Sequence, residues 1–590
     1  MNIKLKIFGM VLIAALVSAP VMKLFAQTKT ATASGTVAPS LDKLKTAVEV
    51  NPNDIKAISA YYETFNESNP GHQKDLAIQF QTWVKQFPKA SYLPIFLSRA
   101  MKAAAVTTDK NALEKLKLAV EAAPDSLSRH NAYIEAIGPD NPEIAKRYDA
   151  LIKEFPKCAT IPYALAKVYI DQESPKAKPY LLKAVAIDPK YGKAWADLWM
   201  DAQRWGDFNQ GWKYLEKAMA ADPSNADYAF SYATSFMGLD QDKFTELSLK
   251  IAKDFPNSDK GVRALGYLAS RSSEKDQIKY YQLLHDSFPP NVSGGYMGSY
   301  FYLLLATNSE KAESLATEMK TAKLGGGTNW SNLAEQAELV IQGKKLLDQN
   351  KPGDALAVFS KVKVPRYALS ANKSLSLLKS EAIDQMGNHS AAYDTIMKAF
   401  IKIPSPIMQE ALYRYGEKLG KTGAAVKADI YKNLEANAKQ ATPFTLKKYV
   451  GEGSTSLSDY KGKVMLLTYW FPGCGPCRGE MPFFENVVKQ YKDKPLAYVG
   501  INISPEQDEY VIPFHNHSGF SFTPLADVKR REKGNLDNRG AAPVNFLIDQ
   551  NGRIIFSDFS IHAENEADLK LMVDLLLNAP DEFTKNKRAE

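Results

Sequence analysis

The sequence predicts a multidomain protein in which a long α-helical solenoid precedes a C-terminal α/β domain. Three observations lead to this prediction. The chain has 590 residues, which is too many for a single hydrophobic core, because domains usually hold about 100–200 residues. Prolines recur about every 34 residues through the first half of the chain. Near Thr442 the helical periodicity gives way to short apolar runs separated by turn residues.

The composition is that of a globular protein and excludes several functional classes. Hydrophobic residues make up 45% and charged residues 24% of the chain, so disorder is not expected. The net charge of +8 is small for this length and its basic residues are interspersed with acidic ones, which argues against a nucleic-acid partner. Two of the three cysteines lie in one four-residue motif, which indicates chemistry rather than a disulfide-stapled scaffold.

The N-terminus has the pattern of an export signal. Lys4 and Lys6 precede Ile7–Met22, an uncharged stretch that is short for a membrane span of about 20 residues. We therefore expect a signal peptide over residues 1–26, cut after Ala26. The alternative is an uncleaved membrane anchor. Either way, the protein is predicted to be exported to the bacterial periplasm or cell envelope.

The repeat pattern begins after a linker over residues 27–41. An apolar residue stands five positions before each recurring proline, and a proline cannot continue the helix that the apolar residue packs. A period near 34 residues with two helices per unit is the spacing of tetratricopeptide repeats. The prolines are Pro52, Pro88, Pro124, Pro156, Pro189, Pro223, Pro256 and Pro289.

The unit from Gly192 to Pro223 resembles a tetratricopeptide repeat in its residues as well as its length. Gly206-Asp207-Phe208 is expected to separate its two helices, and its large and small side chains stand at the positions that the repeat prescribes. These side chains belong to Trp195, Leu198, Gly211, Leu215 and Ala218.

We predict tetratricopeptide-like repeats over residues 42–322 and divergent helical repeats over residues 323–437. Gly325-Gly326-Gly327 is expected to break the chain. Gly353-Asp354-Ala355 and Gly387-Asn388-His389 are expected to form turns between helices. Such a solenoid is predicted to bind a partner protein on its concave surface, and the alternative is a spacer.

The isolated cysteine, Cys158, has a different interpretation from the paired ones. It follows Pro156 at the expected start of a helix. A single cysteine in such a place is more often a small structural side chain than a redox group. We therefore predict a structural role for it.

The C-terminal region, residues 438–580, has the element order of an α/β fold, and residues 581–590 form a polar tail. A buried strand is expected at Val464–Trp470 and a helix at Arg478–Tyr491, with the motif Cys474-Gly475-Pro476-Cys477 between them. The remaining expected elements are a strand at Leu496–Ile503, a hairpin of Val544–Asp549 and Arg553–Phe556, and a helix at Ala567–Leu577. Strand, CxxC, helix, strand, hairpin and helix is the thioredoxin-like order.

The spacing of the two cysteines suits thiol–disulfide exchange. Two residues between cysteines at a helix N-terminus bring both sulfurs within disulfide reach, and the helix dipole favours a thiolate there. Cys474 would attack a substrate disulfide and Cys477 would resolve the mixed disulfide. Pro476 suits an early helix position. The Gly-Pro pair is that of thioredoxin, whose potential of about −270 mV favours reduction.

The last 140 or so residues resemble thioredoxin-like reductases of the TlpA/ResA type. The motifs that match are Phe444-Thr445-Leu446, Ser456–Lys463, Cys474–Pro482 (CGPCRGEMP), and Ala542-Pro543 before Phe546–Asp549. The resemblance implies a cis-proline at Pro543 beside the redox centre, with Ala542 pairing with an extended substrate. Pro476 and Trp470 are predicted to contact the substrate as well.

Two positions depart from the family pattern. Gly473 stands where the family often has Trp, which would loosen the substrate-facing wall. Thr468 stands where thioredoxin has a buried acid, so proton transfer from Cys477 needs another group. Glu480 matches a glutamate of the ResA-type proteins and is the candidate. The alternative is a solvated helix carboxylate.

Three other functions are considered. A peroxidase of the peroxiredoxin type would need Thr or Ser where Phe471 stands, and zinc would need about four ligands. His515 and His517 are expected to be surface residues, so neither a metal nor another cofactor is predicted. An envelope scaffold or chaperone that uses the repeats remains the alternative to an oxidoreductase. The resemblance implies protein thiols or disulfides as substrates and a membrane thiol as electron donor.

Overall fold

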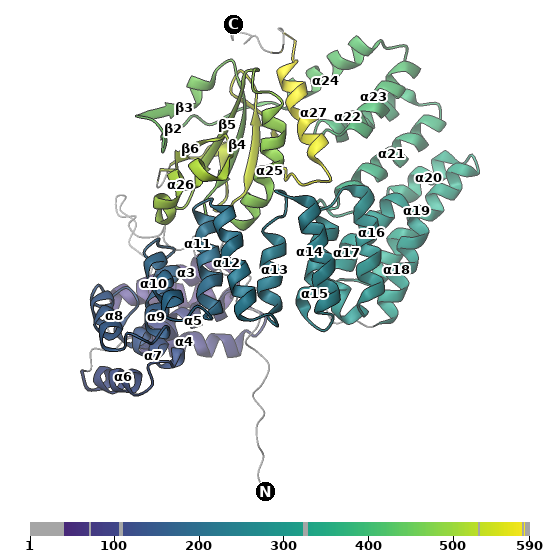
Figure 1. Ribbon diagram of the computed structural model, residues 1–590. Helices are drawn as coiled ribbons and strands as arrows, with labels where there is room; N and C mark the ends of the chain where they lie inside the picture. Colours follow the sequence, from purple (N-terminus) through teal and green to yellow (C-terminus); the bar gives the residue numbers. More distant parts are fainter. Residues whose placement is uncertain are drawn as a thin grey trace. The chain divides into compact units, whose positions relative to one another are not determined.

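The computed structural model describes residues 40–69, 72–105, 110–322, 328–528, 531–580 and 583. The predicted signal peptide, most of the linker, Gly325-Gly326-Gly327 and the tail except Phe583 lie outside these residues. The chain divides into two compact units, one ending at Asp201 and the other beginning at Ala202. Figure 1 labels the helices and strands of both. Among the described helices, none combines the length and the apolar character that crossing a membrane requires.

The first unit is built from α-helices. They are α2 (Leu41–Val50), α3 (Ile55–Ser68), α4 (Gln73–Gln86), α5 (Leu93–Ala105), α6 (Lys110–Ala122), α7 (Leu127–Ile137), α8 (Glu143–Glu154), α9 (Thr160–Asp171), α10 (Ala177–Ile187) and most of α11 (Gly192–Arg204).

The second unit starts with further helices and ends in the α/β domain. The helices are α12 (Phe208–Ala221), α13 (Ala226–Thr234), α14 (Gln241–Asp254), α15 (Asp259–Ser270), α16 (Glu274–Ser287), α17 (Pro290–Thr307), α18 (Ser309–Thr321), α19 (Trp330–Asp348), α20 (Pro352–Phe359), α21 (Leu369–Gln385), α22 (His389–Phe400), α23 (Pro406–Lys418) and α24 (Gly423–Asn437). We call α12–α24 the helical segment of this unit.

The recurring prolines stop helices as predicted. Each stands two residues after a helix ends, for example Pro223 after Ala221 and Pro256 after Asp254. In most repeats, the carbonyl of the apolar residue five positions before the proline accepts the last hydrogen bond of the helix. In α12 the carbonyl of Ala218 accepts the last hydrogen bond, from the N–H of Asp222, one residue before the proline. Proline then has no N–H to extend the ladder.

The predicted breaks between helices are confirmed at Gly206 and at Gly387 but not at Gly353. Gly206 has a positive φ of 70°, and Asp207 caps α12 by accepting a hydrogen bond from Gln210 N–H. Gly353 instead lies in the first turn of α20, because Pro352 occupies an early helix position for which its fixed φ is suited. The turn itself precedes Pro352.

The α/β domain is built around a six-stranded sheet of mixed direction. Its order is β1-β8-β7-β4-β5-β6, with β4, β5 and β6 parallel and the other pairs antiparallel. The strands are β1 (Lys439–Gln440), β4 (Val464–Trp470), β5 (Leu496–Asn502), β6 (Thr523–Ala526), β7 (Val544–Ile548) and β8 (Arg553–Ser557), with β2 (Thr445–Lys447) and β3 (Ser454–Ser456) pairing separately. The predicted strands are confirmed to within one residue at each end.

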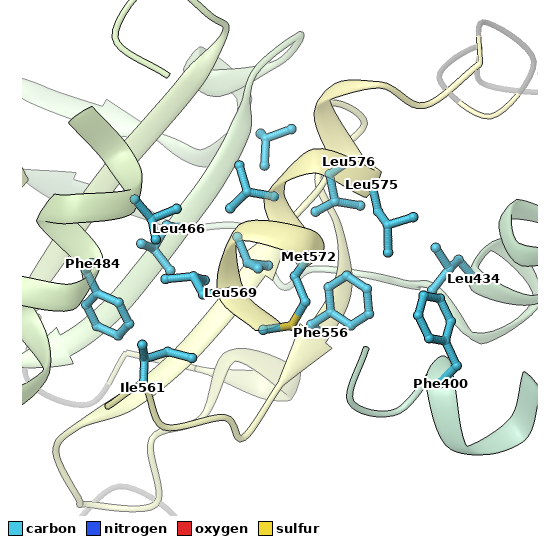
Figure 2. Close-up of a cluster of buried hydrophobic side chains, with 14 of the residues drawn as sticks. Phe400, Leu434, Leu466, Phe484, Phe556, Ile561, Leu569, Met572, Leu575 and Leu576 are labelled. Atoms are coloured by element: carbon cyan, nitrogen blue, oxygen red, sulfur yellow. The ribbon is translucent and has the colours of Figure 1, made fainter. Parts of the chain in front are cut away.

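Three helices accompany the sheet: α25 (Gly475–Lys489), α26 (Asp508–Ser518) and α27 (Glu566–Leu577). Helix α27 lies between the sheet and the helical segment. Figure 2 shows Leu569 of α27 on the side of Leu466 and Phe484, and Leu575 on the side of Leu434 and Phe400. One buried apolar cluster therefore joins α22–α24 to the redox-motif helix α25.

Aromatic side chains make a second junction within this unit. The ring of Trp205, just after α11, lies 5.3 Å from the ring of Tyr510 in α26. The ring of Phe208 lies 6.3 Å from those of Phe514 and Phe520. The helical segment and the α/β domain thus pack against each other over more than one helix.

Candidate functional site

The cysteine motif forms the first turn of α25. Cys474 is the N-cap residue and its Sγ accepts a hydrogen bond from the backbone N–H of Cys477, 3.2 Å away. The two cysteines are joined by a disulfide bond, with their Cα atoms 5.3 Å apart. The helix was predicted to begin at Arg478 but begins at Gly475, because Pro476 needs no N–H partner in the first turn. A sulfur at this N-cap faces backbone N–H groups that stabilise a thiolate.

The motif meets solvent through the two residues between the cysteines. Gly475 and Pro476 are exposed, whereas Cys474 and Cys477 are 3% and 2% exposed. Ala542 and Pro543 are half-buried and joined by a cis peptide bond, as the resemblance implied. Ala542 packs against the same apolar cluster that contains both cysteines. A partner that reaches the sulfurs must therefore approach over Gly475-Pro476.

Trp470 was predicted to contact the substrate, and its position does not fit that role. It is fully buried, with its ring 4.8 Å from that of Phe522 and 5.0 Å from that of Phe514. Every residue of β4 is buried, because β4 lies in the middle of the sheet with both faces covered. Trp470 therefore supports the floor of the site from within the core.

The wall beside Gly473 is filled by a residue that the sequence analysis missed. The side chain of Gln507 accepts a hydrogen bond from Gly473 N–H at 2.6 Å and is itself buried. A Cβ atom at position 473 would lie 2.8 Å from Gln507 Nε2. The space that a Trp at this position would occupy is thus taken by the side chain of Gln507, which lies against Gly473. A polar residue directly before α26 was the sequence signal, but nothing in the pattern linked it to position 473.

Glu480 is buried, which excludes the alternative of a solvated helix carboxylate. It lies in α25, three residues after Cys477, and is 2% exposed. Its Oε2 accepts a hydrogen bond from Asn545 Nδ2 at 2.8 Å. Burial raises the pKa of Glu480 to about 7, against the opposing effect of hydrogen bonds from Asn545, Ser560 and the Ile561 backbone. A carboxyl with such a pKa can accept and return a proton near neutral pH.

Asn545 is a second residue that the sequence analysis missed. It lies in β7, where it pairs with Thr468 of β4, so the strand register brings its amide under α25. The amide also donates to the carbonyl of Phe559 at 2.8 Å. A polar residue inside the apolar run Val544–Ile548 was the available signal. Thr468, in place of the thioredoxin acid, is buried in the adjacent strand.

A cationic side chain accompanies the motif. Arg478 follows Cys477, and its Nη1 donates to the carbonyl of Pro472 at 2.7 Å. Burial and then the charge of Arg204 lower the pKa of Arg478 to about 10, so it still carries its charge at neutral pH. A positive charge at the start of α25 adds to the helix dipole in favouring a thiolate.

The remaining candidate ligands lie in separate places. Cys158 is a half-buried free thiol of the first unit that donates to the carbonyl of Pro124 at 3.0 Å. His517 is exposed, whereas His515 is half-buried against the ring of Phe522, which differs from the expected surface position. Within the residues that the structure describes, no three His, Cys, Asp or Glu side chains are grouped so as to hold a metal ion.

Comparison with known proteins gives matches in the C-terminal region. The Redoxin family model matches residues 436–570. The thioredoxin-like protein YneN of Bacillus subtilis is 35% identical over 140 residues, which cover 23% of this chain and 78% of YneN. The thiol–disulfide oxidoreductase ResA of Geobacillus kaustophilus is 31% identical over 145 residues, which cover 22% of this chain and 77% of ResA.

A solved structure of similar type also matches. It is a thiol:disulfide interchange protein of the thioredoxin family from Chlorobium tepidum, 23% identical, covering 24% of this chain and 97% of that chain with a TM-score of 0.21. A score this low adds no argument. The sequence matches therefore carry the assignment, and they concern the domain that holds the cysteine motif.

Proposed function

The chain belongs to the thioredoxin-like thiol–disulfide oxidoreductases that include YneN and ResA, and from this premise we propose that it is an exported reductase of protein disulfides. The observation that carries the proposal is the position of Cys474: it caps α25 and is bonded to Cys477, which lies one turn before the buried Glu480. Three points are part of the proposal: that the exchange runs in the direction of substrate reduction, that the protein is exported, and that the helices recruit partners.

The reaction would proceed in two exchanges. The Cys474 thiolate attacks one sulfur of a substrate disulfide, that S–S bond breaks, and the other substrate sulfur leaves as a thiolate that takes up a proton. Cys477 then loses its proton and attacks Cys474 Sγ. The Cys474–Cys477 disulfide forms, the mixed disulfide breaks, and the second substrate sulfur leaves. Two electrons pass from the dithiol to the substrate, and a thiol donor, which we propose to be a membrane protein, must restore the dithiol.

Glu480 is proposed to accept the proton of Cys477. The two residues lie on one face of α25 because they are three positions apart. The pKa of Glu480, raised by burial to about 7, matches a proton acceptor that works near neutral pH. The Cys477 thiol has to lose a proton inside a largely buried site, where water does not serve as the base as easily as at the surface.

The substrate is proposed to lie over Gly475-Pro476 and along Ala542 and Pro543. This proposal is supported by the exposure of Gly475 and Pro476 between the two buried cysteines, and by Ala542, which packs against the apolar cluster that contains both cysteines. An extended polypeptide would suit this surface, because a backbone can approach glycine and proline closely. The repeats are proposed to recruit the protein that carries the disulfide.

Covalent trapping tests the proposal. In Cys477→Ser the mixed disulfide on Cys474 cannot be resolved, so incubation with an oxidised protein such as insulin should leave an adduct that dithiothreitol releases. The same variant isolated from cells should carry client proteins that mass spectrometry can identify. The matched control is the double variant Cys474→Ser/Cys477→Ser, which has no nucleophile. Equal adduct yields from both proteins would contradict the proposal and favour a scaffold.

A further inference from the structure

The loop between β8 and α27 connects the helical segment to Glu480. On the α/β side, Ser560 and the backbone of Ile561 donate hydrogen bonds to the Glu480 carboxyl. Asn565 braces the same loop, because its side chain donates to the Ser560 carbonyl at 2.8 Å and accepts from His562 N–H at 2.7 Å. The loop therefore holds two of the donors that surround Glu480.

The helical segment holds this loop through polar side chains. The Arg271 guanidinium, at the C-terminus of α15, donates to His562 Nε2. Gln277 of α16 donates to Glu564, and Lys373 of α21 forms an ion pair of 2.6 Å with Asp568 at the start of α27. All of these residues belong to the second compact unit. The contacts of Arg271 with His562, of His562 with Asn565 and of Asn565 with Ser560 connect the end of α15 to a donor of Glu480.

The protonation state of His562 is consistent with its acceptance of a hydrogen bond from Arg271. Burial and then the charge of Arg271 lower the pKa of His562 to about 3, so the imidazole is neutral at neutral pH. A neutral imidazole has one ring nitrogen that accepts, and the guanidinium can only donate. Nε2 is therefore the acceptor and the proton stays on Nδ1.

We propose that Arg271 of the helical segment is a positioning residue for proton transfer at the redox centre, which it serves by fixing the His562 loop and by placing a positive charge near Glu480. This inference rests on the proposed role of Glu480 as the proton acceptor of Cys477. The helices are then part of the redox machinery as well as a surface for partners.

The charge of Arg271 sets the direction of the expected effect. It opposes the rise that burial causes in the pKa of Glu480, so removing it makes the carboxylate harder to form. The other ionisable groups that face Glu480 or Arg271 are Tyr281 of α16, Tyr498 of β5, His562 and Glu564. Of these, the neutral His562 and the protonated Tyr498 bring no positive charge that could replace the guanidinium, because burial raises the pKa of Tyr498 well above its usual range.

The test is the pH profile of a single resolution step in the full-length protein. A preformed mixed disulfide between Cys474 and a chromogenic thiol, 2-nitro-5-thiobenzoate, is followed as Cys477 releases the thiol. In wild type the rate should rise with pH as Glu480 loses its proton. In Arg271→Gln the midpoint should move to higher pH, and at pH 6.5 the step should slow on the order of threefold to tenfold. Arg271→Lys should restore part of the shift.

Matched controls separate this inference from the proposed function. Arg263→Gln removes an arginine of the same helix that stacks on Phe230 instead, and it should leave the midpoint unchanged. Glu480→Gln should abolish the rise of the resolution rate with pH that depends on Glu480, which we call the Glu480-dependent limb of the pH profile. In the Glu480→Gln background, Arg271→Gln should have no further effect on this limb. If the limb survives in Glu480→Gln, the proton-transfer proposal fails.

If the limb is lost in Glu480→Gln but Arg271→Gln keeps the wild-type midpoint, the Arg271 inference alone fails. Should Arg271→Gln not fold, His562→Ala removes the same contact from the loop side. It should move the midpoint in the same direction by a smaller amount, and an unmoved midpoint would overturn the inference.

Discussion

The helical segment and the α/β domain of the second unit are ordered by different means. In the helices, most turns are specified locally, by a proline two residues beyond a helix end or by a capping side chain such as Asp207. In the α/β domain, the central strand β4 pairs with strands that lie about 30 and 80 residues further along the chain. Yet both regions contribute to one apolar cluster around α27.

This difference explains what each region reveals about function. Repeated apolar positions encode packing between neighbouring helices and say little about a ligand. The Cys474–Cys477 motif encodes chemistry because its spacing and helix position are what thiol–disulfide exchange requires. The junction between them, from Arg271 to His562, carries neither pattern, and its importance follows from three-dimensional contacts alone.

The largest expected effect is on disulfide reduction, and it distinguishes the cysteine of the first compact unit from those of the second. Cys474→Ser should reduce dithiothreitol-dependent insulin reduction by about a thousandfold or more, because the attacking thiolate is gone. Cys158→Ser should keep wild-type activity, since that thiol donates to the carbonyl of Pro124 instead of capping a helix. The measurement is the initial rate of turbidity with each reduced protein. A comparable loss in Cys158→Ser would mean that the first unit takes part in the chemistry.

The next effect tests whether the helical segment and the α/β domain fold as one. Leu569 is fully buried in α27, and Leu569→Ala should lower the free energy of unfolding by about 2–5 kcal/mol. Because the cluster is shared, amide hydrogen exchange should accelerate in α22–α24 as well as in α25. The control is Leu315→Ala in α18, which belongs to a separate helical cluster and should leave α25 protected. Faster exchange confined to the α/β domain would show two independent folding units.

How much of this could be predicted depends on the range of each interaction. The helix ends before the eight recurring prolines follow from single residues and were predicted correctly. The cysteine motif was placed correctly between β4 and α25, although the helix begins at Gly475 and not at Arg478. Trp470 was misplaced because β4 is buried on both faces, which leaves no alternation to show where a side chain points.

The environment of Glu480 could not be decided from the sequence. Its hydrogen-bond donor Asn545 follows it by 65 residues and is placed beside it through strand pairing. The contact of Arg271 with His562 spans 291 residues and has no periodic or motif signal. Interactions of this kind need the tertiary structure, because a local pattern records only neighbours along one helix or strand.

The smallest expected effect is that of the Glu480 carboxyl on the pH dependence of the free energy of unfolding. The pKa of Glu480 is raised from its ordinary 4.5 to about 7 in the folded chain, so the folded state binds the proton more tightly than the unfolded state does. The stabilisation is complete below pH about 4.5 and is lost as the pH rises through 7. Chemical denaturation of the oxidised protein should therefore show wild type losing about 1–3 kcal/mol relative to Glu480→Gln between pH 5 and pH 8.

A matched variant in α26 isolates this effect from general changes of charge. Glu509 is exposed in the first turn of that helix, and Glu509→Gln should run parallel to wild type over the same pH range. If Glu480→Gln also ran parallel, the carboxyl would titrate alike in the folded and unfolded chains. Burial in the α/β domain would then not have prepared it to exchange a proton with Cys477, and the helical segment would have no proton acceptor to position.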